Sequence, residues 1–169
     1  MHPADILDET IVSWQRERPD LDLAAMDTAL RLNMLVTIGT QFVAAAVAAH
    51  GVSLGEFDVL AALRRSGNEA ELTPSILAKV AMLSPSGMTN RLDRLEAAGL
   101  VVRRPDPTDR RVSLISLTPR GRKVADQVVT DIVAAETEAF SVLSPAEHDR
   151  LDRTLDRLIS QLAPPAADS

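Results

Sequence analysis

The chain has 169 residues, a length typical of one domain with a hydrophobic core and too short for two independent domains. Aromatic residues are scarce, and the absence of Cys excludes a disulfide framework, a thiolate metal site and a thiol redox switch. The net charge of −6 argues at first against a nucleic-acid partner. No uninterrupted apolar run approaches about 18 residues and no basic leader precedes an apolar stretch, so we expect a soluble cytoplasmic protein with no membrane partner.

Two helices are predicted in the N-terminal third of the chain. Residues 2–17 form a moderately amphipathic segment that ends before Pro19, and residues 23–50 repeat apolar positions at helical spacing up to Gly51. Inside the second helix, Gly39 is less favourable than Ala by roughly 1 kcal/mol, which indicates close packing. A helix this apolar must be covered on more than one side, either by the core of its own chain or by a second copy.

Three shorter helices are predicted next from their start and stop signals. Residues 53–56 form a capping box, and Gly67 ends the helix that it opens. Residues 73–74, Thr followed by Pro, open a second helix, and residues 84–85, Ser followed by Pro, open a third that Gly99 ends. Two short helices joined by a turn of about three residues match the helix-turn-helix arrangement.

The third of these helices has an apolar side and a polar side. Met88, Leu92 and Leu95 recur at spacings of four and three residues, which predicts one buried stripe. Exposed Ser, Thr, Asn and Arg on a helix are the types that reach base edges and phosphates in a major groove, although an ordinary solvated face has the same composition. The candidate DNA contacts on this helix are Ser84, Ser86, Gly87, Thr89, Asn90, Arg91 and Arg94.

A β-hairpin is predicted directly after that helix. The runs 100–102 and 112–117 are β-branched or alternating, and residues 103–111 between them carry Pro and Asp turn formers. Asp109 is expected to hold a neighbouring arginine in position by an ion pair. Arginines on such a turn serve either solubility or contact with phosphate and the minor groove. The arginines expected at the hairpin tip are Arg103, Arg104, Arg110 and Arg111, of which Arg103, Arg110 and Arg111 are candidate DNA contacts.

The charges are distributed unevenly. Residues 84–123 hold nine basic and four acidic side chains, a net +5, which leaves −11 on the rest of a chain whose total is −6. A basic element on an acidic body orients a protein on DNA and keeps the remainder of it away from the phosphates.

Two further helices are predicted at the C-terminal end. Residues 118–119 open one that runs to about Phe140, and residues 144–147 form a capping box that opens the other. The last helix repeats leucine at an a/d-like spacing, which indicates a covered face. Either a second copy or the chain's own helices would cover it. The leucines are Leu151, Leu155, Leu158 and Leu162.

The stretch from residue 84 to residue 121, SPSGMTNRLDRLEAAGLVVRRPDPTDRRVSLISLTPRG, resembles the winged helix-turn-helix of the MarR family of bacterial transcription regulators. The most specific features are 109–111, Asp-Arg-Arg, and 117–118, Leu-Thr, together with 94–96, Arg-Leu-Glu. The resemblance extends over about 120 residues from Phe57 to the C-terminal helices, and the stretch around Trp14 is also similar to members of the family.

The resemblance implies a mainly α fold with a small β-hairpin wing and with N- and C-terminal dimerisation helices. It further implies a homodimer that binds a palindromic operator in double-stranded DNA, and a repressor that responds to a small aromatic or anionic effector. The first helix would pack across the partner subunit; its alternative is to lie on its own chain. The expected regions are N-terminal dimerisation helices at 1–52, a DNA-binding lobe at 53–118, C-terminal dimerisation helices at 119–163 and a flexible tail at 164–169.

A ligand site is suggested by the urate-responsive branch of the resembled family, which uses a Trp, an Asp, an Arg and an Asn. The positions that match here are Trp14, Asp58 and Arg91, whereas the fourth is Ser66, with Asn68 nearby, so the set is incomplete. The alternatives are that Trp14 anchors packing and that Asp58 pairs with Arg91 as a structural bridge.

Catalysis is not indicated by any motif. His2, His50 and His148 are far apart in the sequence, and neither a glycine-rich phosphate loop nor a nucleophile motif is present. We therefore expect neither an enzyme nor a cofactor nor a metal site. The competing hypothesis is a winged-helix module that binds an acidic protein through its basic tip and does not bind DNA.

Overall fold

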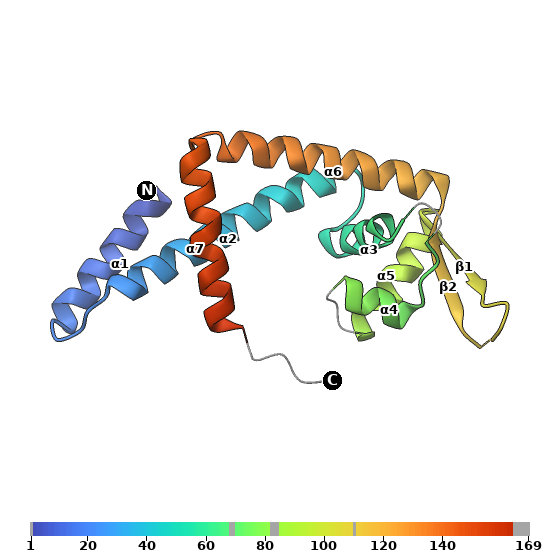
Figure 1. The fold of residues 1–169 in the computed structure, drawn as a ribbon, viewed down its shortest axis with the longest axis horizontal. Coiled ribbons are helices and arrows are strands. Elements are labelled where there is room, and N and C mark those ends of the chain that lie inside the picture. Colours follow the sequence, from blue (N-terminus) through green and yellow to red (C-terminus); the bar gives the residue numbers. More distant parts are fainter. Residues whose placement is uncertain (1, 68–69, 82–84, 110, 164–169) are drawn as a thin grey trace. The chain divides into compact units, whose positions relative to one another are not determined.

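The computed structural model describes residues 2–67, 70–81, 85–109 and 111–163 (Figure 1). The chain divides into two compact units, Met1–Val129 and Thr130–Ser169. The mainly helical fold with a two-stranded hairpin confirms the predicted fold class. The elements in chain order are α1 (Pro3–Glu17), α2 (Ala24–Ala48), α3 (Leu54–Arg65), α4 (Pro74–Val80), α5 (Pro85–Ala97), β1 (Val101–Pro105), β2 (Ser113–Leu117), α6 (Pro119–Phe140) and α7 (Pro145–Leu162).

The predicted capping signals form where the local sequence places them. The Ser53 hydroxyl accepts from the Glu56 N–H at 3.3 Å, and the Glu56 carboxylate accepts from the Ser53 N–H at 2.8 Å. The Thr73 hydroxyl likewise accepts from the Ile76 N–H at 3.3 Å. These bonds satisfy N–H groups that have no partner inside the helix, which is why each helix begins at that residue.

The start of α1 uses a cap that the residue types did not signal. His2 Nδ1 accepts from the Ala4 N–H at 3.2 Å, and the Asp5 carboxylate accepts from the His2 N–H at 2.9 Å. The imidazole is therefore a helix cap.

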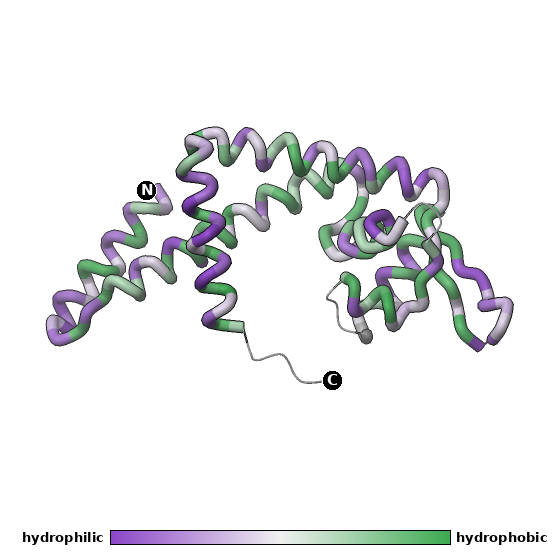
Figure 2. The backbone as a smooth tube through the Cα atoms, viewed as in Figure 1, coloured by the Kyte–Doolittle hydropathy of each residue, from purple (hydrophilic) through white to green (hydrophobic). Residues whose placement is uncertain are grey.

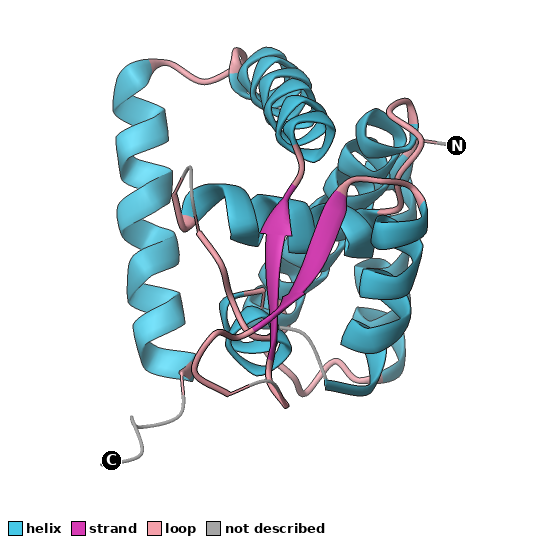
Figure 3. Ribbon diagram, turned by 90° about the vertical axis from the view of Figure 1, so that its right-hand side faces the viewer, coloured by secondary structure: helices cyan, strands magenta, loops and turns pink. Residues whose placement is uncertain are grey.

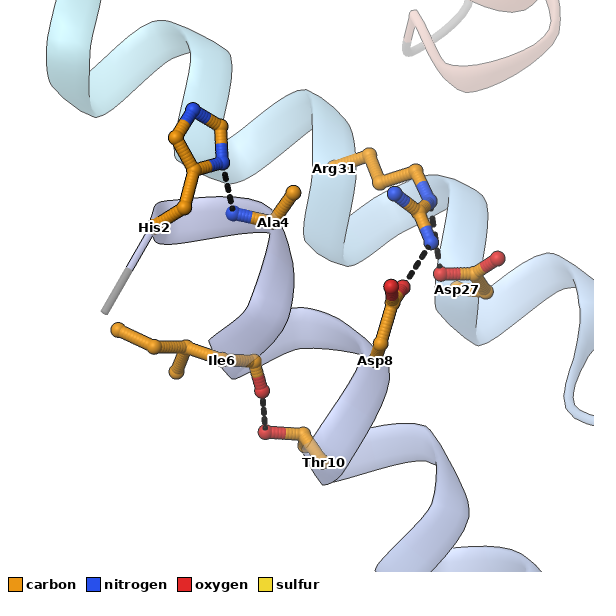
Figure 4. Close-up of polar contacts among 7 residues, drawn as sticks. All are labelled: His2, Ala4, Ile6, Asp8, Thr10, Asp27 and Arg31. Carbon is orange, nitrogen blue, oxygen red and sulfur yellow. Dashed lines mark hydrogen bonds and ion pairs between the residues drawn. The ribbon is translucent and has the colours of Figure 1, made fainter.

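The α1 helix packs against α2, where Arg31 bonds Asp8 of α1 at 2.6 Å and pairs with Asp27 at 2.9 Å (Figure 4).

The apolar residues of α2 are largely uncovered in the single chain. Figure 2 shows hydrophobic residues along much of this helix, and Val36 is 65% exposed. By length and composition α2 is apolar enough to cross a membrane, a test that the core helix of a soluble protein also passes. Among the described residues of the single chain, the close packing expected at Gly39 is not found, since a Cβ built there meets none of their atoms within 4 Å. The exposed large residues on α2 are Met26, Leu35, Val36, Ile38 and Phe42.

The winged helix-turn-helix has its own small core, to which α3, α4, α5 and the hairpin all contribute. At its centre lies Ile115 of β2, which is fully buried and forms a bridge with Leu72 through hydrogen bonds of 2.8 and 3.0 Å. The largest buried side chains around it are Leu60, Leu63, Leu77, Met88, Leu92 and Leu95.

The first strand of the hairpin extends further than predicted, whereas the second begins one residue later. The antiparallel register pairs Val101 with Leu117 and extends to Pro105 opposite Ser113 (Figure 3). The expectation that Arg103 and Arg104 lie at the tip is wrong, because both belong to β1. Proline is tolerated at the end of an edge strand, so the Pro signal did not end the ladder before Pro105.

The unit Thr130–Ser169 contains the end of α6 and all of α7. The Glu147 carboxylate accepts from the Ser144 N–H at 2.9 Å, as the predicted capping box requires. Along the described length of α7 no side chain is buried, and Leu162 is 80% exposed. The leucine stripe therefore keeps an uncovered side in the single chain.

Candidate nucleic-acid interface

The helix α5 has two sides of opposite character, as its spacing predicted. Met88, Leu92 and Leu95 are almost completely buried in the core of the lobe. Thr89 and Asn90 are exposed on the outer side. Burial of the apolar stripe fixes the rotation of the helix, so the polar side chains stay directed away from the core.

The other predicted contacts on α5 differ in how they are held. Arg94 has a 76% exposed side chain and lies 4.0 Å from the Glu56 carboxylate of α3. Arg91 is half-buried, and Gly87 is half-buried near the start of the helix. Ser84 and the side chain of Ser86 lie outside the described residues.

Arg91 lies directly against the first turn of α3. A Cβ built on Gly55 would come 2.5 Å from Arg91 Nε and 2.9 Å from Nη2. The guanidinium therefore occupies space that a larger residue at Gly55 would take. Since α3 packs on α5, this contact places a positive charge at the boundary between the two helices.

Arg103 is engaged within the protein. Its guanidinium pairs with Asp93 by a short contact and with Glu96 at 3.1 Å, and its side chain is 31% exposed. Asp93 and Glu96 are three residues apart on α5, so they share a helix face. These ion pairs attach the middle of β1 to α5, a role that the residue pattern did not predict, and DNA contact by Arg103 stays a prediction. The i, i+3 acidic pair was the available signal.

The hairpin tip is ordered by side chains that bind its own backbone. The Asp106 carboxylate accepts from the N–H and the hydroxyl of Thr108 at 2.7 and 2.6 Å, and from the Asp109 N–H at 3.3 Å. The Thr108 hydroxyl and these backbone groups lower the pKa of Asp106. The tip is thus held by an Asx-type turn.

Asp109 also acts through the backbone. Its carboxylate accepts from the Arg111 N–H at 2.9 Å. Asp109 thus contacts Arg111 through this backbone hydrogen bond. An ion pair between Asp109 and a neighbouring guanidinium had been expected. Arg111 itself is exposed, and Arg110 lies outside the described residues.

The three candidate ligand residues do not share one described pocket. Trp14 is 46% exposed and lines a shallow hollow of about 410 Å³ formed by α1 residues alone. Asp58 is half-buried, and burial raises the pKa of its carboxyl, while the charges of Arg91 and Arg65 act in the opposite direction. The charge of Arg91 thus acts on the Asp58 carboxyl, whereas the hollow beside Trp14 contains neither residue.

Ser66, at the fourth position of the candidate ligand site, bonds the end of α3. The Ser66 hydroxyl donates to the Ala62 carbonyl at 2.9 Å. Asn68 lies outside the described residues. Among the described residues, no group of three or more His, Asp or Glu side chains is placed to hold a metal ion.

Comparison with known sequences gives one consistent result. A model of the MarR family matches residues 50–112. The HTH-type transcriptional regulator PecS of Dickeya dadantii is 35% identical over 157 residues, which cover 91% of this chain and 93% of that protein.

Solved structures of the same fold include two with informative partners. CouR from Rhodococcus jostii, bound to p-coumaroyl-CoA, is 26% identical with a TM-score of 0.67, covering 84% of this chain and 96% of that one. A MarR variant from E. coli, complexed with operator DNA, has a TM-score of 0.66 over 86% of this chain and 97% of that one. At 24% identity the second likeness shows the fold alone.

Proposed function

Because the chain belongs to the MarR family of winged helix-turn-helix transcriptional regulators, we propose that it binds a specific palindromic operator as a homodimer and represses transcription until an effector binds. The relatives reported above are regulators and not enzymes. A cytoplasmic location is part of the same proposal.

One observation carries the DNA-binding part, the two-sided character of α5. Its apolar stripe is buried, and Thr89, Asn90 and Arg94 face outward. Asn bonds adenine and Arg bonds guanine by paired hydrogen bonds in the major groove, whereas Thr contacts bases or phosphate. We propose that these three side chains supply base and phosphate contacts.

The hairpin supplies the second contact. Arg111 is exposed beside a turn whose backbone is fixed by Asp106 and Asp109. A guanidinium on a rigid turn loses less entropy on binding phosphate or the narrow minor groove than one on a mobile loop. We propose that Arg110 and Arg111 border the minor groove next to the segment read by α5.

The homodimer is supported by apolar surface that the single chain leaves uncovered. Val36 and Phe42 on α2 and Leu162 on α7 are all exposed. Each large side chain of this type gains about 1.5–3 kcal/mol on full burial, so a second copy is a strong candidate to cover them. Two recognition helices about 10 bp apart would then read an imperfect palindrome of about 16 to 20 bp.

Oligomeric state is measured directly by sedimentation. The wild type is expected to sediment as a dimer, and Val36→Glu is expected to shift it toward monomer, because a carboxylate would be buried unpaired at the interface. Ile76→Glu is the matched control, since Ile76 is 47% exposed on α4, in the DNA-binding lobe and outside the dimerisation helices. A monomeric wild type, or equal effects of the two changes, would count against this interface.

The effector is proposed to be a small aromatic or anionic compound. Support comes from CouR, which has been solved with p-coumaroyl-CoA, and from the half-buried positions of Asp58 and Arg91, whose charge acts on the Asp58 carboxyl. Such a ligand weakens DNA binding only if it prefers a protein state that DNA does not. Release of bound DNA by aromatic acids is therefore the assay for it.

The first experiment is an anisotropy titration of the protein against the DNA upstream of its own gene, at about 0.1 M salt. Nanomolar affinity that excess random duplex does not displace is expected. The logarithm of the affinity should fall steeply with the logarithm of salt concentration, because phosphate contacts release counterions.

A charge-matched pair of double variants makes the titration specific. Arg94→Ala with Arg111→Ala is expected to abolish specific binding. Arg153→Ala with Arg157→Ala removes the same charge from α7 and is expected to leave most of the affinity. Equal losses would indicate non-specific attraction, and absence of binding by the wild type to any upstream duplex would favour the protein-binding module.

A further inference from the structure

The end of α5 and the start of α6 are joined by backbone carbonyls of one and side-chain donors of the other. The α5 helix ends in a Schellman motif, in which the Leu100 N–H bonds the Leu95 carbonyl and the Gly99 N–H bonds the Glu96 carbonyl, both at 2.9 Å. Gly99 has φ of 68°, which this ending requires. The motif leaves the carbonyls of Ala98 and Gly99 without a partner inside α5.

Thr118, just before α6, and Arg120, in its first turn, donate hydrogen bonds to those carbonyls. The Thr118 hydroxyl donates to the Gly99 carbonyl at 2.8 Å and lies 3.2 Å from the Leu100 carbonyl, which also accepts the Thr118 N–H at 3.1 Å. Arg120 Nη1 donates to the Ala98 carbonyl at 3.1 Å. The cation of Arg120 thereby also meets the negative end of the α5 dipole.

The Thr118 hydroxyl serves both helices at once. It accepts from the Gly121 N–H at 2.9 Å, which caps α6, while its proton is directed to the end of α5. One oxygen thus links the last carbonyls of α5 to the first N–H groups of α6. We call residues 98–100 and 118–121 the α5–α6 joint.

Contact at the joint is too close for any side chain at Gly121. A Cβ built there would lie 1.8 Å from the Leu100 carbonyl oxygen and 2.7 Å from its carbon. A second attachment follows on α6, where Asp126 accepts from Arg64 Nε of α3 at 2.6 Å. The beginning of α6 is therefore bonded to two helices of the DNA-binding lobe.

We propose that Thr118, Arg120 and Gly121 are positioning residues that set the half-site spacing of the operator. This inference rests on the proposed function, in which α6 belongs to the dimerisation helices. Because the joint bonds the start of α6 directly to the end of α5, the dimer would hold the two α5 helices at one separation. An operator with one extra base pair moves a half-site by about 3.4 Å and rotates it by about 34°, which a rigid joint resists.

The test compares affinities for operators whose half-sites are separated by the best spacing and by one base pair more or less. The wild type is expected to lose at least about tenfold at either altered spacing, comparable to a mismatched site. Thr118→Val keeps the side-chain shape and removes the hydroxyl bonds, which loosens the joint. The affinity that this variant loses at either altered spacing is therefore expected to be below about threefold. Affinity for a duplex with a single half-site normalises each variant.

Two further variants separate positioning from stability. Thr118→Ser restores the hydroxyl and is expected to restore the wild-type spacing profile. Thr137→Val removes a hydroxyl that bonds the Val133 carbonyl within α6, and it is expected to leave the profile unchanged. If Thr118→Val does not fold, Arg120→Met is used in its place. Loss of one charge lowers affinity at every spacing equally, so the ratio of affinities at the best and altered spacings still reports on the joint.

Failure of the role assigned to the α5–α6 joint and failure of the proposed DNA-binding function give different results. A wild type without sequence-specific binding would refute the proposed function. A wild type that binds with a sharp spacing preference, shared unchanged by Thr118→Val and Arg120→Met, would overturn the role of the joint alone.

Discussion

Gly121→Ala is the most informative single change for the fold. A methyl group at this position would overlap the Leu100 carbonyl, since the two atoms would be 1.8 Å apart. The Leu100 carbonyl belongs to the backbone of a buried residue, so it cannot move aside as a flexible side chain would. The start of α6 must therefore move away from the end of α5.

The expected cost follows from three contributions. Overpacking of this kind costs about 1–3 kcal/mol. Separation of the two helices also loses the bonds from Thr118 and Arg120, at about 1 kcal/mol each. Alanine in a helix returns up to about 1 kcal/mol relative to glycine. We expect the free energy of unfolding to fall by about 2–4 kcal/mol.

The assay is urea denaturation followed by circular dichroism at one fixed protein concentration, because a dimer's stability depends on concentration. With a slope of about 2 kcal/mol per molar, the midpoint should fall by about 1–2 M. Gly55→Ala is the control, since the atoms nearest to its methyl group would belong to the movable end of Arg91. Its stability should stay within about 1 kcal/mol of the wild type. A Gly121→Ala variant as stable as Gly55→Ala would refute the close approach of the two helices.

Three other predictions concern the interface and its charges. A double-mutant cycle of Asp93→Asn and Arg103→Met should give a coupling of about 0.5–1 kcal/mol in urea denaturation, because the ion pair is partly exposed. Zero coupling would contradict the view that this ion pair attaches the hairpin to α5. Asn90→Ala should cost about 1–3 kcal/mol of binding and relax the base preference at one operator position, whereas Arg111→Ala should weaken all sequences alike and reduce the salt slope by about 1; the reverse pattern would exchange their roles. Asp58 has a raised pKa in the folded state, so its ionisation destabilises the fold as pH rises through that pKa. Asp58→Asn should therefore raise the melting temperature at pH 7, with the difference closing as pH falls toward about 4; a difference independent of pH would contradict this.

Local chemistry made most of the elements predictable. The capping boxes at Ser53 and Ser144 each place a helix start within a few residues, because the partner N–H groups are only three positions away. The buried stripe of α5 followed from spacing alone, since a helix repeats every 3.6 residues. The family resemblance then assigned these elements to one fold, which the comparisons confirm.

The predictions that failed depended on contacts between distant residues. The β1 strand continues beyond its predicted end to Pro105, the first of the turn-forming residues, because β2 offers a paired partner up to that position. Arg103 faces Asp93 and Glu96 only after the hairpin folds back beside α5. No spacing within either element reveals that meeting.

The order of the helices, the presence of a hairpin, the outward face of α5 and the family were all predictable from residue patterns. Tertiary structure alone decided that Gly121 rests on the Leu100 carbonyl and that Thr118 bonds the end of α5. The physical reason is range: caps and periodicity act over three or four residues, whereas the joint brings together backbone atoms about 20 positions apart, whose separation depends on the whole lobe.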